Sequence, residues 1–295
     1  MHSGVLAAVA AYLLWGFLPI YWKSVQTASA AEILCHRTCW SLVVYLFLFW
    51  SLQQKKELYQ VARNRAHLLL YVASSLLLAA NSLLSIWVIN AGYILETSLA
   101  SFINPLISVL FGAIFFRERL RPAQIAALAL MVAAVVYLTI FYGKFPWIPL
   151  ALATSFAIYG LLHKKATEPV LTGLLLETIV VFPAALAFLI WLDIQGSGQF
   201  IHAGWSSSLL LAGAGLATSV PLLLFNFAAQ RIPLSLIGLL QYLSPTISLL
   251  IGLGIYHEDF PRDRLIGFFI IWLALLLYLM EGGLRRLRTK KVALD

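Results

Sequence analysis

Long apolar stretches separated by short polar connections fill almost the whole of this 295-residue sequence. A bilayer core about 30 Å thick is crossed by a helix of roughly 17 to 25 residues. The pattern therefore predicts an all-α integral membrane protein with ten transmembrane helices. We place them at residues 5–22, 33–52, 68–90, 95–116, 123–142, 146–162, 171–192, 207–229, 234–256 and 264–283.

Composition supports lipid as the solvent of this chain. Hydrophobic residues make up 62% of the sequence and charged residues only 11%, whereas a soluble domain has roughly 25% charged residues. The net charge of +8 comes from residues in short loops, so we expect no nucleic-acid partner. Cys35 and Cys39 lie four apart on one helix, a spacing that is poor for a disulfide.

The basic residues predict the orientation in the membrane. Fifteen Lys and Arg residues fall on one side of the ten spans and four on the other, while Arg37 lies inside a span. Cytoplasmic loops carry the excess of Lys and Arg. We therefore expect a multi-pass protein with both termini in the cytoplasm.

One proline-containing helical segment occurs twice in the sequence. "FINPLISVLFGAIFFRE" at 102–118 and "YLSPTISLLIGLGIYHE" at 242–258 share six residues at the same offsets, 140 residues apart. We divide the chain into two five-helix repeats, 1–145 and 146–295. Because five is odd, the second repeat enters the membrane from the opposite side. Inverted repeats are typical of transporters that work by alternating access, although a duplication kept only for folding would give the same pattern.

Pro105 and Pro245 lie in the middle of their spans and predict helix breaks. A proline leaves the carbonyl four residues earlier without its donor, and that carbonyl must face protein or a wet cavity. Asn81, Asn104 and Gln241 lie nearby and predict a polar lining. The alternative is that these amides join helices by hydrogen bonds.

Repeat-related aromatic residues suggest the kind of ligand. Trp15 and Tyr159 are each followed by a glycine, and Trp87, Phe102 and Tyr242 have aromatic partners in the other repeat. Rings with a few amides suit a flat apolar or zwitterionic ligand. Many of these rings are instead expected to face lipid or the interface.

The ionisable residues inside the spans are Glu32, His36, Arg37 and Glu177. Such residues are candidates for function by default. Glu32 and Glu177 are repeat-related and are the best candidates for proton carriers, although none of the acids is at the midplane. Cys35, His36 and Cys39 lack a fourth zinc ligand, so we expect no metal and no cofactor. No P-loop, zinc-protease or serine-hydrolase motif is present, so we expect no enzyme.

The motifs "AYLLWG" at 11–16, "EILCHR" at 32–37, "SLASFINPL" at 98–106, "FFRERL" at 115–120 and "LLQYLSPTISLL" at 239–250 resemble EamA-type transporters of the drug/metabolite transporter superfamily. Within that family the chain is similar to RarD-type and YddG-type bacterial proteins. The resemblance implies a basket of ten helices in a bacterial inner membrane, and export of amino acids, aromatic ones among them, or of related metabolites. It implies a substrate cavity lined by Trp15, Asn81, Trp87, Phe102, Asn104, Tyr159, Asn226, Gln241 and Tyr242.

Two functions therefore stay open. The first is an exporter of amino acids or similar small metabolites that works by alternating access as a monomer or weak dimer in the lipid bilayer. The second is a multidrug or cationic-compound exporter of the same superfamily, which would need an accessible carboxylate in its cavity. A membrane enzyme or receptor would need a catalytic cluster that the sequence does not show.

Overall fold

The structure is a computed structural model of the whole chain. It describes residues 2–25, 28–53, 58–59, 61, 63–91, 94–143, 145–200, 202–257, 266, 269–270, 272–274 and 276. Long helices make up nearly all of these residues, and none of the described residues is in a strand. The predicted all-α class is confirmed. The predicted tenth span, 264–283, lies outside the described residues except for isolated positions, and Glu258 lies outside them as well.

Ten helices are described in the parts of the chain given above. The first half of the chain provides α1 (His2–Ser24), α2 (Ala30–Ser51), α4 (Arg65–Asn90), α5 (Ile94–Phe115) and α6 (Pro122–Tyr142). The second half provides α7 (Trp147–Lys165), α8 (Val170–Ile194), α9 (Trp205–Ala229), α10 (Leu234–Leu240) and α11 (Leu243–Gly254).

Each of the first eight predicted spans corresponds to one helix, and the ninth is divided into α10 and α11. By length and hydropathy, six described segments are able to cross a membrane: α1, α2, residues 65–85 of α4, α8, α9 and residues 234–254.

Local signals explain several helix ends. Ser29 precedes α2, and its hydroxyl accepts a hydrogen bond from the Glu32 N–H at 3.2 Å, which is an N-cap. Gly143 ends α6 with a φ of 72°, a left-handed conformation that glycine adopts without strain. Glu118 caps a helix that is distant in sequence. Its carboxylate accepts the backbone N–H groups of Leu234 at 2.7 Å and Ser235 at 2.9 Å, at the start of α10.

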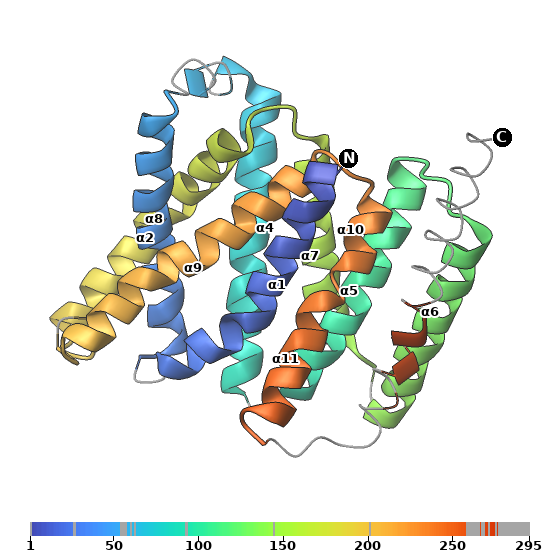
Figure 1. Cartoon of the computed structure of the whole chain (residues 1–295). Coiled ribbons are helices and arrows are strands. Elements are labelled where there is room, and N and C mark those ends of the chain that lie inside the picture. Colours follow the sequence, from blue (N-terminus) through green and yellow to red (C-terminus); the bar gives the residue numbers. More distant parts are fainter. Residues whose placement is uncertain are drawn as a thin grey trace.

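The helices of the two halves interleave rather than forming two separate bundles (Figure 1). Contacts between α1 and α9 have a counterpart between α4 and α7, and α2–α9 contacts have a counterpart between α4 and α8. Contacts of α1 with α11 likewise match those of α5 with α7. If each helix is replaced by its equivalent in the other half, each of these contacts becomes its counterpart. The α2–α8 and α5–α10 contacts are unchanged by this replacement, because their two helices are equivalent to each other. This is the pattern that a two-fold relation between the halves requires.

The first helices of the two halves run in opposite directions. A Cβ atom on Gly4, near the start of α1, would lie 2.7 Å from a side-chain atom of Ile232. Lys164, near the end of α7, donates a hydrogen bond to the Ile232 carbonyl. The start of α1 and the end of α7 therefore lie at the same end of the molecule, as inverted repeats require.

The two proline-containing helices differ. Pro105 lies inside α5, which continues without interruption, so the expected break at Pro105 is not an interruption of the helix. In the second half the helix is interrupted at Gln241 and Tyr242, just before Pro245. The partner helix contributes a hydrogen bond to the α5 backbone near the proline. The Tyr242 hydroxyl donates to the Phe102 carbonyl at 3.0 Å, one turn before Pro105.

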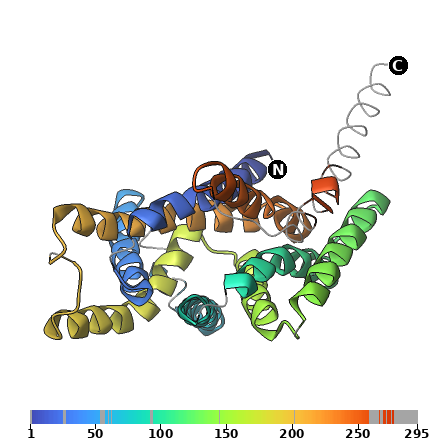
Figure 2. The same cartoon turned by 90° about the horizontal axis from the view of Figure 1, so that it is seen from below.

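Helix α5 lies beside α6 on one side and beside α10 and α11 on the other (Figure 1). Side chains of these helices form a large apolar core. Phe102, Ile103, Leu239 and Tyr242 are buried in this core. We call this contact between α5 and α10–α11 the proline joint. Figure 2 shows that α8 and α9 lie toward one end of the molecule and α6 toward the other.

Candidate functional site

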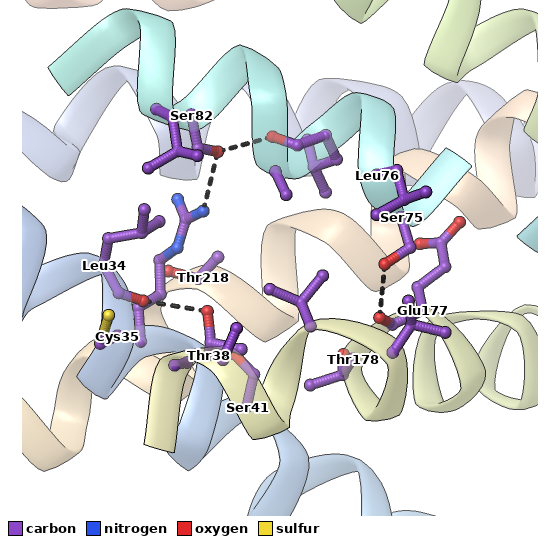
Figure 3. Close-up of a pocket in the computed structure, with 18 of the residues that line it drawn as sticks. Leu34, Cys35, Thr38, Ser41, Ser75, Leu76, Ser82, Glu177, Thr178 and Thr218 are labelled. Carbon is purple, nitrogen blue, oxygen red and sulfur yellow. Dashed lines mark hydrogen bonds between the residues drawn. The ribbon is translucent and has the colours of Figure 1, made fainter. Parts of the chain in front are cut away.

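A cavity of about 390 Å³ lies among α2, α4, α8 and α9. Figure 3 shows Leu34, Cys35, Thr38 and Ser41 along α2 on one wall. The other walls come from α4, from α8 and from Thr218 and Leu222 of α9. Leucine, alanine and valine side chains make up much of the lining, together with a small number of polar groups. This is the usual composition of a small-molecule site, and the volume is within the usual range of roughly 300–1,000 Å³.

The cavity lies where the two halves face each other. Its four helices are two exchange-related pairs, α2 with α8 and α4 with α9. Serine hydroxyls join the walls across the halves. Ser41 of α2 donates to the Gly215 carbonyl of α9 at 3.2 Å, and Ser75 of α4 donates to the Glu177 carbonyl of α8 at 2.7 Å. Hydrogen bonds thus connect α2 to α9 and α4 to α8 beside the cavity.

Arg37 is the basic residue of the cavity lining. It lies seven residues after the start of α2, about 10 Å along the helix. Its guanidinium donates a hydrogen bond to the Ser82 hydroxyl of α4 at 3.3 Å. Ser82 in turn donates to the Leu78 carbonyl at 2.8 Å. Within the part of the chain that the structure describes, no carboxylate is within ion-pair distance of Arg37.

Two further polar groups of the lining are buried. The hydroxyl oxygens of Tyr45 and Thr218 are buried without a hydrogen bond to any described residue, and both residues line the cavity. Tyr45 is 1% exposed and Thr218 is 6% exposed. Buried polar atoms in native structures are nearly always paired with protein, water or a ligand. The cavity is therefore a place for water or a polar ligand.

Glu177 also lies on the cavity wall, and its carboxylate is bound by other side chains. Ser74 donates to it, the Tyr159 hydroxyl donates at 3.2 Å, and a His163 ring nitrogen lies 2.7 Å from it. Asn226 donates to the Tyr159 hydroxyl at 3.0 Å. All five side chains are buried. The carboxylate is therefore held in a polar network beside the cavity.

The repeat-related acid, Glu32, has different surroundings. Its carboxylate accepts the Gln199 N–H at 2.6 Å, and a His36 ring nitrogen is 3.9 Å away on the next turn. The His36 ring packs against Phe200, with ring centroids 4.7 Å apart. Glu32 and His36 thus hold the start of α2 against the connection between α8 and α9. Glu177 and Glu32 are equivalent in sequence but not in contacts.

None of the nine predicted substrate residues is in the lining of this cavity. Three of them pack between helices of different halves. Trp15 lies against Tyr12, Phe156 and Phe225, with ring centroids 5.6–6.1 Å apart. Asn81 donates to the Leu152 carbonyl and the Ser155 hydroxyl of α7. Trp87 is 49% exposed beside Trp147.

Six more belong to the network or to the proline joint. Tyr159 and Asn226 belong to the Glu177 network. Phe102 and Tyr242 are buried at the proline joint, where Gln241 is half-buried at the interruption between α10 and α11. Asn104 is half-buried, and its side-chain oxygen has no partner among the described residues. The Asn226 side-chain oxygen also has none.

The sequence interpretation missed Tyr45, Ser82 and Thr218 as cavity groups and His163 as the partner of Glu177. A signal for one wall was present. Thr38, Ser41 and Tyr45 follow one another at spacings of three and four residues, which places them on one face of α2. A polar stripe on a membrane helix indicates a face turned toward protein or water.

Comparison with known proteins places the chain among transporters. The sequence model of the EamA-like transporter family matches residues 2–140 and again residues 146–280. A solved crystal structure has the same fold, with a TM-score of 0.71 and 20% sequence identity, covering 93% of this chain and 96% of that chain.

Bacterial relatives match over nearly their full length. Protein RarD of Streptomyces exfoliatus is 40% identical over 294 residues, covering 100% of this chain and 93% of the relative. The uncharacterized transporter YojE of Bacillus subtilis is 41% identical over 281 residues, covering 94% of this chain and 93% of the relative. The family, its two matches and the all-helical fold agree with one another. The chain belongs to the EamA-like transporter family, a family of bacterial multi-pass membrane transporters.

Proposed function

We propose that this transporter exports amino acids, aromatic ones among them, or closely similar small metabolites across a bacterial inner membrane by alternating access. The observation that carries the proposal is the position of the cavity. It lies between exchange-related helices, where motion of one half against the other would open it to either side. Both termini are cytoplasmic in this proposal, and the two halves, 1–145 and 146–295, are the moving units.

The chemistry of the cavity supports a small ligand with both polar and apolar parts. Leu34, Leu76 and Phe188 offer apolar surface, while the guanidinium of Arg37 and the hydroxyls of Tyr45 and Thr218 offer hydrogen bonds. An amino acid with an apolar side chain has the matching parts. A few placed polar groups in an apolar site fix orientation and give specificity.

The alternative function, export of cationic compounds, has less support. It needs a carboxylate available to the ligand, and the cavity wall carries Glu177. That carboxylate is already bound by Ser74, Tyr159 and His163. The positive charge of Arg37 opposes a cation in the same cavity.

The nine residues predicted from the sequence define a second position for the substrate, closer to the proline joint. Two of them support it, because the side-chain oxygens of Asn104 and Asn226 are buried without partners among the described residues. The two positions are separable by mutation, since no residue belongs to both sets.

Uptake of labelled amino acids into proteoliposomes tests the proposal. Ala79 of α4 lines the cavity, whereas its neighbour Ala80 is exposed on the outside of the helix. We expect Ala79→Phe to fill the cavity and lower the flux at least about tenfold, and Ala80→Phe to leave it unchanged. Absence of flux above empty liposomes for every amino acid would reject the function. Equal flux through both variants would reject this cavity as the route.

A further inference from the structure

We propose that the guanidinium of Arg37 binds a carboxylate group of the transported molecule, so that the transporter selects ligands that carry a carboxylate. This inference rests on the proposed transport function and names the chemical feature by which the cavity recognises its substrate. The ligand's apolar part then lies along Leu34, Leu76 and Phe188, and its other polar atoms meet the hydroxyls of Tyr45 and Thr218.

The first step is that Arg37 has unused hydrogen-bonding capacity. A guanidinium has five N–H donors and stays protonated at physiological pH. Among the described residues, one hydrogen bond, to Ser82, engages it. A charged group inside a membrane is unfavourable unless it is paired or reaches water. Since no acid among the described residues pairs with Arg37, an anion that enters the cavity would supply the missing partner.

The second step concerns the kind of anion. The planar fork of a guanidinium matches a carboxylate with two parallel hydrogen bonds. The hydrogen bond to Ser82 holds one edge of the guanidinium against α4 and leaves the other donors for a ligand. A cavity of about 390 Å³ with mainly leucine, alanine and valine walls suits a small organic acid better than a hydrated inorganic ion.

The third step is that the position of Arg37 makes the contact relevant to transport. Arg37 is on α2 and Ser82 is on α4, both in the first half, whereas Leu174, Val181 and Thr218 line the cavity from the second half. A ligand held by Arg37 therefore touches both halves. Its binding energy would depend on how the halves are arranged, as a transported substrate requires.

Thermal unfolding of the full chain in detergent tests this with matched ligands. Two carboxylic acids, tryptophan and benzoate, are each compared with the matching amide, tryptophanamide or benzamide. Inorganic phosphate is added as an anion without a carboxylate. In the wild type we expect the acids to raise Tm and the amides to leave it unchanged, because only a ligand bound by the folded state stabilises it. We expect Arg37→Gln to weaken acid binding at least tenfold and Arg37→Lys to weaken it less. Arg119→Gln, at an exposed arginine, is the control and should bind the acids like the wild type.

Ser82→Ala provides a second variant that keeps the charge. It frees the guanidinium from its fixed orientation, and we expect a severalfold loss of acid binding with a normal gel-filtration profile. Equal binding of acids and amides by the wild type, unchanged acid binding in Arg37→Gln, or a phosphate response as large as that of the carboxylates would each overturn the inference.

These outcomes are separable from failure of the proposed function. If benzoate binds through Arg37 while no amino acid binds or is transported, the carboxylate site stands and amino-acid export fails. If amino acids are transported equally well by wild type and Arg37→Gln, export stands and the inference fails.

Discussion

Two regions of the molecule are contacts between equivalent helices of the two halves, and these two regions differ in their packing. One is the proline joint, where α5 meets α10. The other is the contact of α2 with α8, which α4 and α9 complete around the cavity. The proline joint is filled by buried apolar side chains. The second region holds a cavity that is lined by Arg37 and by two hydroxyls without a hydrogen-bond partner among the described residues.

Close helix approach explains the filled joint. Gly238 of α10 lies against α5, and a Cβ atom there would be 2.6 Å from the Pro105 carbonyl oxygen. The Tyr242 hydroxyl covers the Phe102 carbonyl of the same turn. The α5 backbone beside Pro105 therefore packs against protein groups, and no described residue of α5 lines the cavity. The comparison teaches that a repeated motif identifies the interface between the halves, but it does not identify where in that interface the substrate binds.

The largest effect is expected from removing the acid beside the cavity. Glu177→Ala leaves Ser74, Tyr159 and His163 without their common acceptor. Buried groups left without partners lower stability by about 3 kcal/mol in total, so thermal unfolding in detergent should show a large fall in Tm. Glu32→Ala is the repeat-matched control, and we expect a smaller fall, because the Glu32 carboxylate accepts one backbone N–H. An equal fall in Tm for both variants would contradict this, because it would mean that the two carboxylates contribute equally to stability.

The next largest effect is expected where α5 and α10 approach each other closely at the proline joint. Gly238→Ala places a methyl group against the Pro105 carbonyl, which lies in the backbone and is not free to move aside. Overpacking of this kind lowers stability by roughly 1–3 kcal/mol. Gly254→Ala is the control, since a Cβ atom there meets nothing within 4 Å. A stable Gly238→Ala variant with unchanged Tm would show that α5 and α10 are not in tight contact.

A smaller effect is expected at the hydroxyl that covers the backbone of α5. Tyr242→Phe removes the hydrogen bond to the Phe102 carbonyl, and we expect a loss of about 1 kcal/mol. Tyr12→Phe removes a buried hydroxyl that has no partner among the described residues, so it should be neutral or slightly stabilising. Thermal unfolding of both variants side by side separates them. The opposite order would contradict the account of the joint.

The smallest effect is expected at a residue of the second substrate position. Asn104→Leu replaces an amide whose oxygen has no partner among the described residues with an apolar group of similar size. Because Asn104 does not line the cavity, amino-acid affinity in proteoliposomes should change less than twofold. A large loss of affinity would instead place the substrate at the residues predicted from the sequence.

The sequence predicted the fold well because each membrane helix carries its own signal. Eight of the predicted spans correspond to single helices, since length and hydropathy are local properties. The site depends on which helices lie next to each other, and the repeat alone does not give this. Tyr45, Ser82 and Thr218 come from three helices far apart in the chain. The sequence identifies Arg37 as a charge inside a span, but only the structure shows that it lines a cavity and that no described carboxylate lies within ion-pair distance of it.

The native cysteines provide the most direct test of the central claim, that a water-accessible cavity lies among α2, α4, α8 and α9. Cys35 lines the cavity, whereas Cys39, one turn further along α2, does not. The variants Cys39→Ser and Cys35→Ser each keep one thiol. In membranes, a charged methanethiosulfonate reagent should modify the Cys39→Ser variant much faster than the Cys35→Ser variant, with equal modification after denaturation. Equal rates in the folded proteins, or faster modification of Cys35→Ser, would contradict the claim.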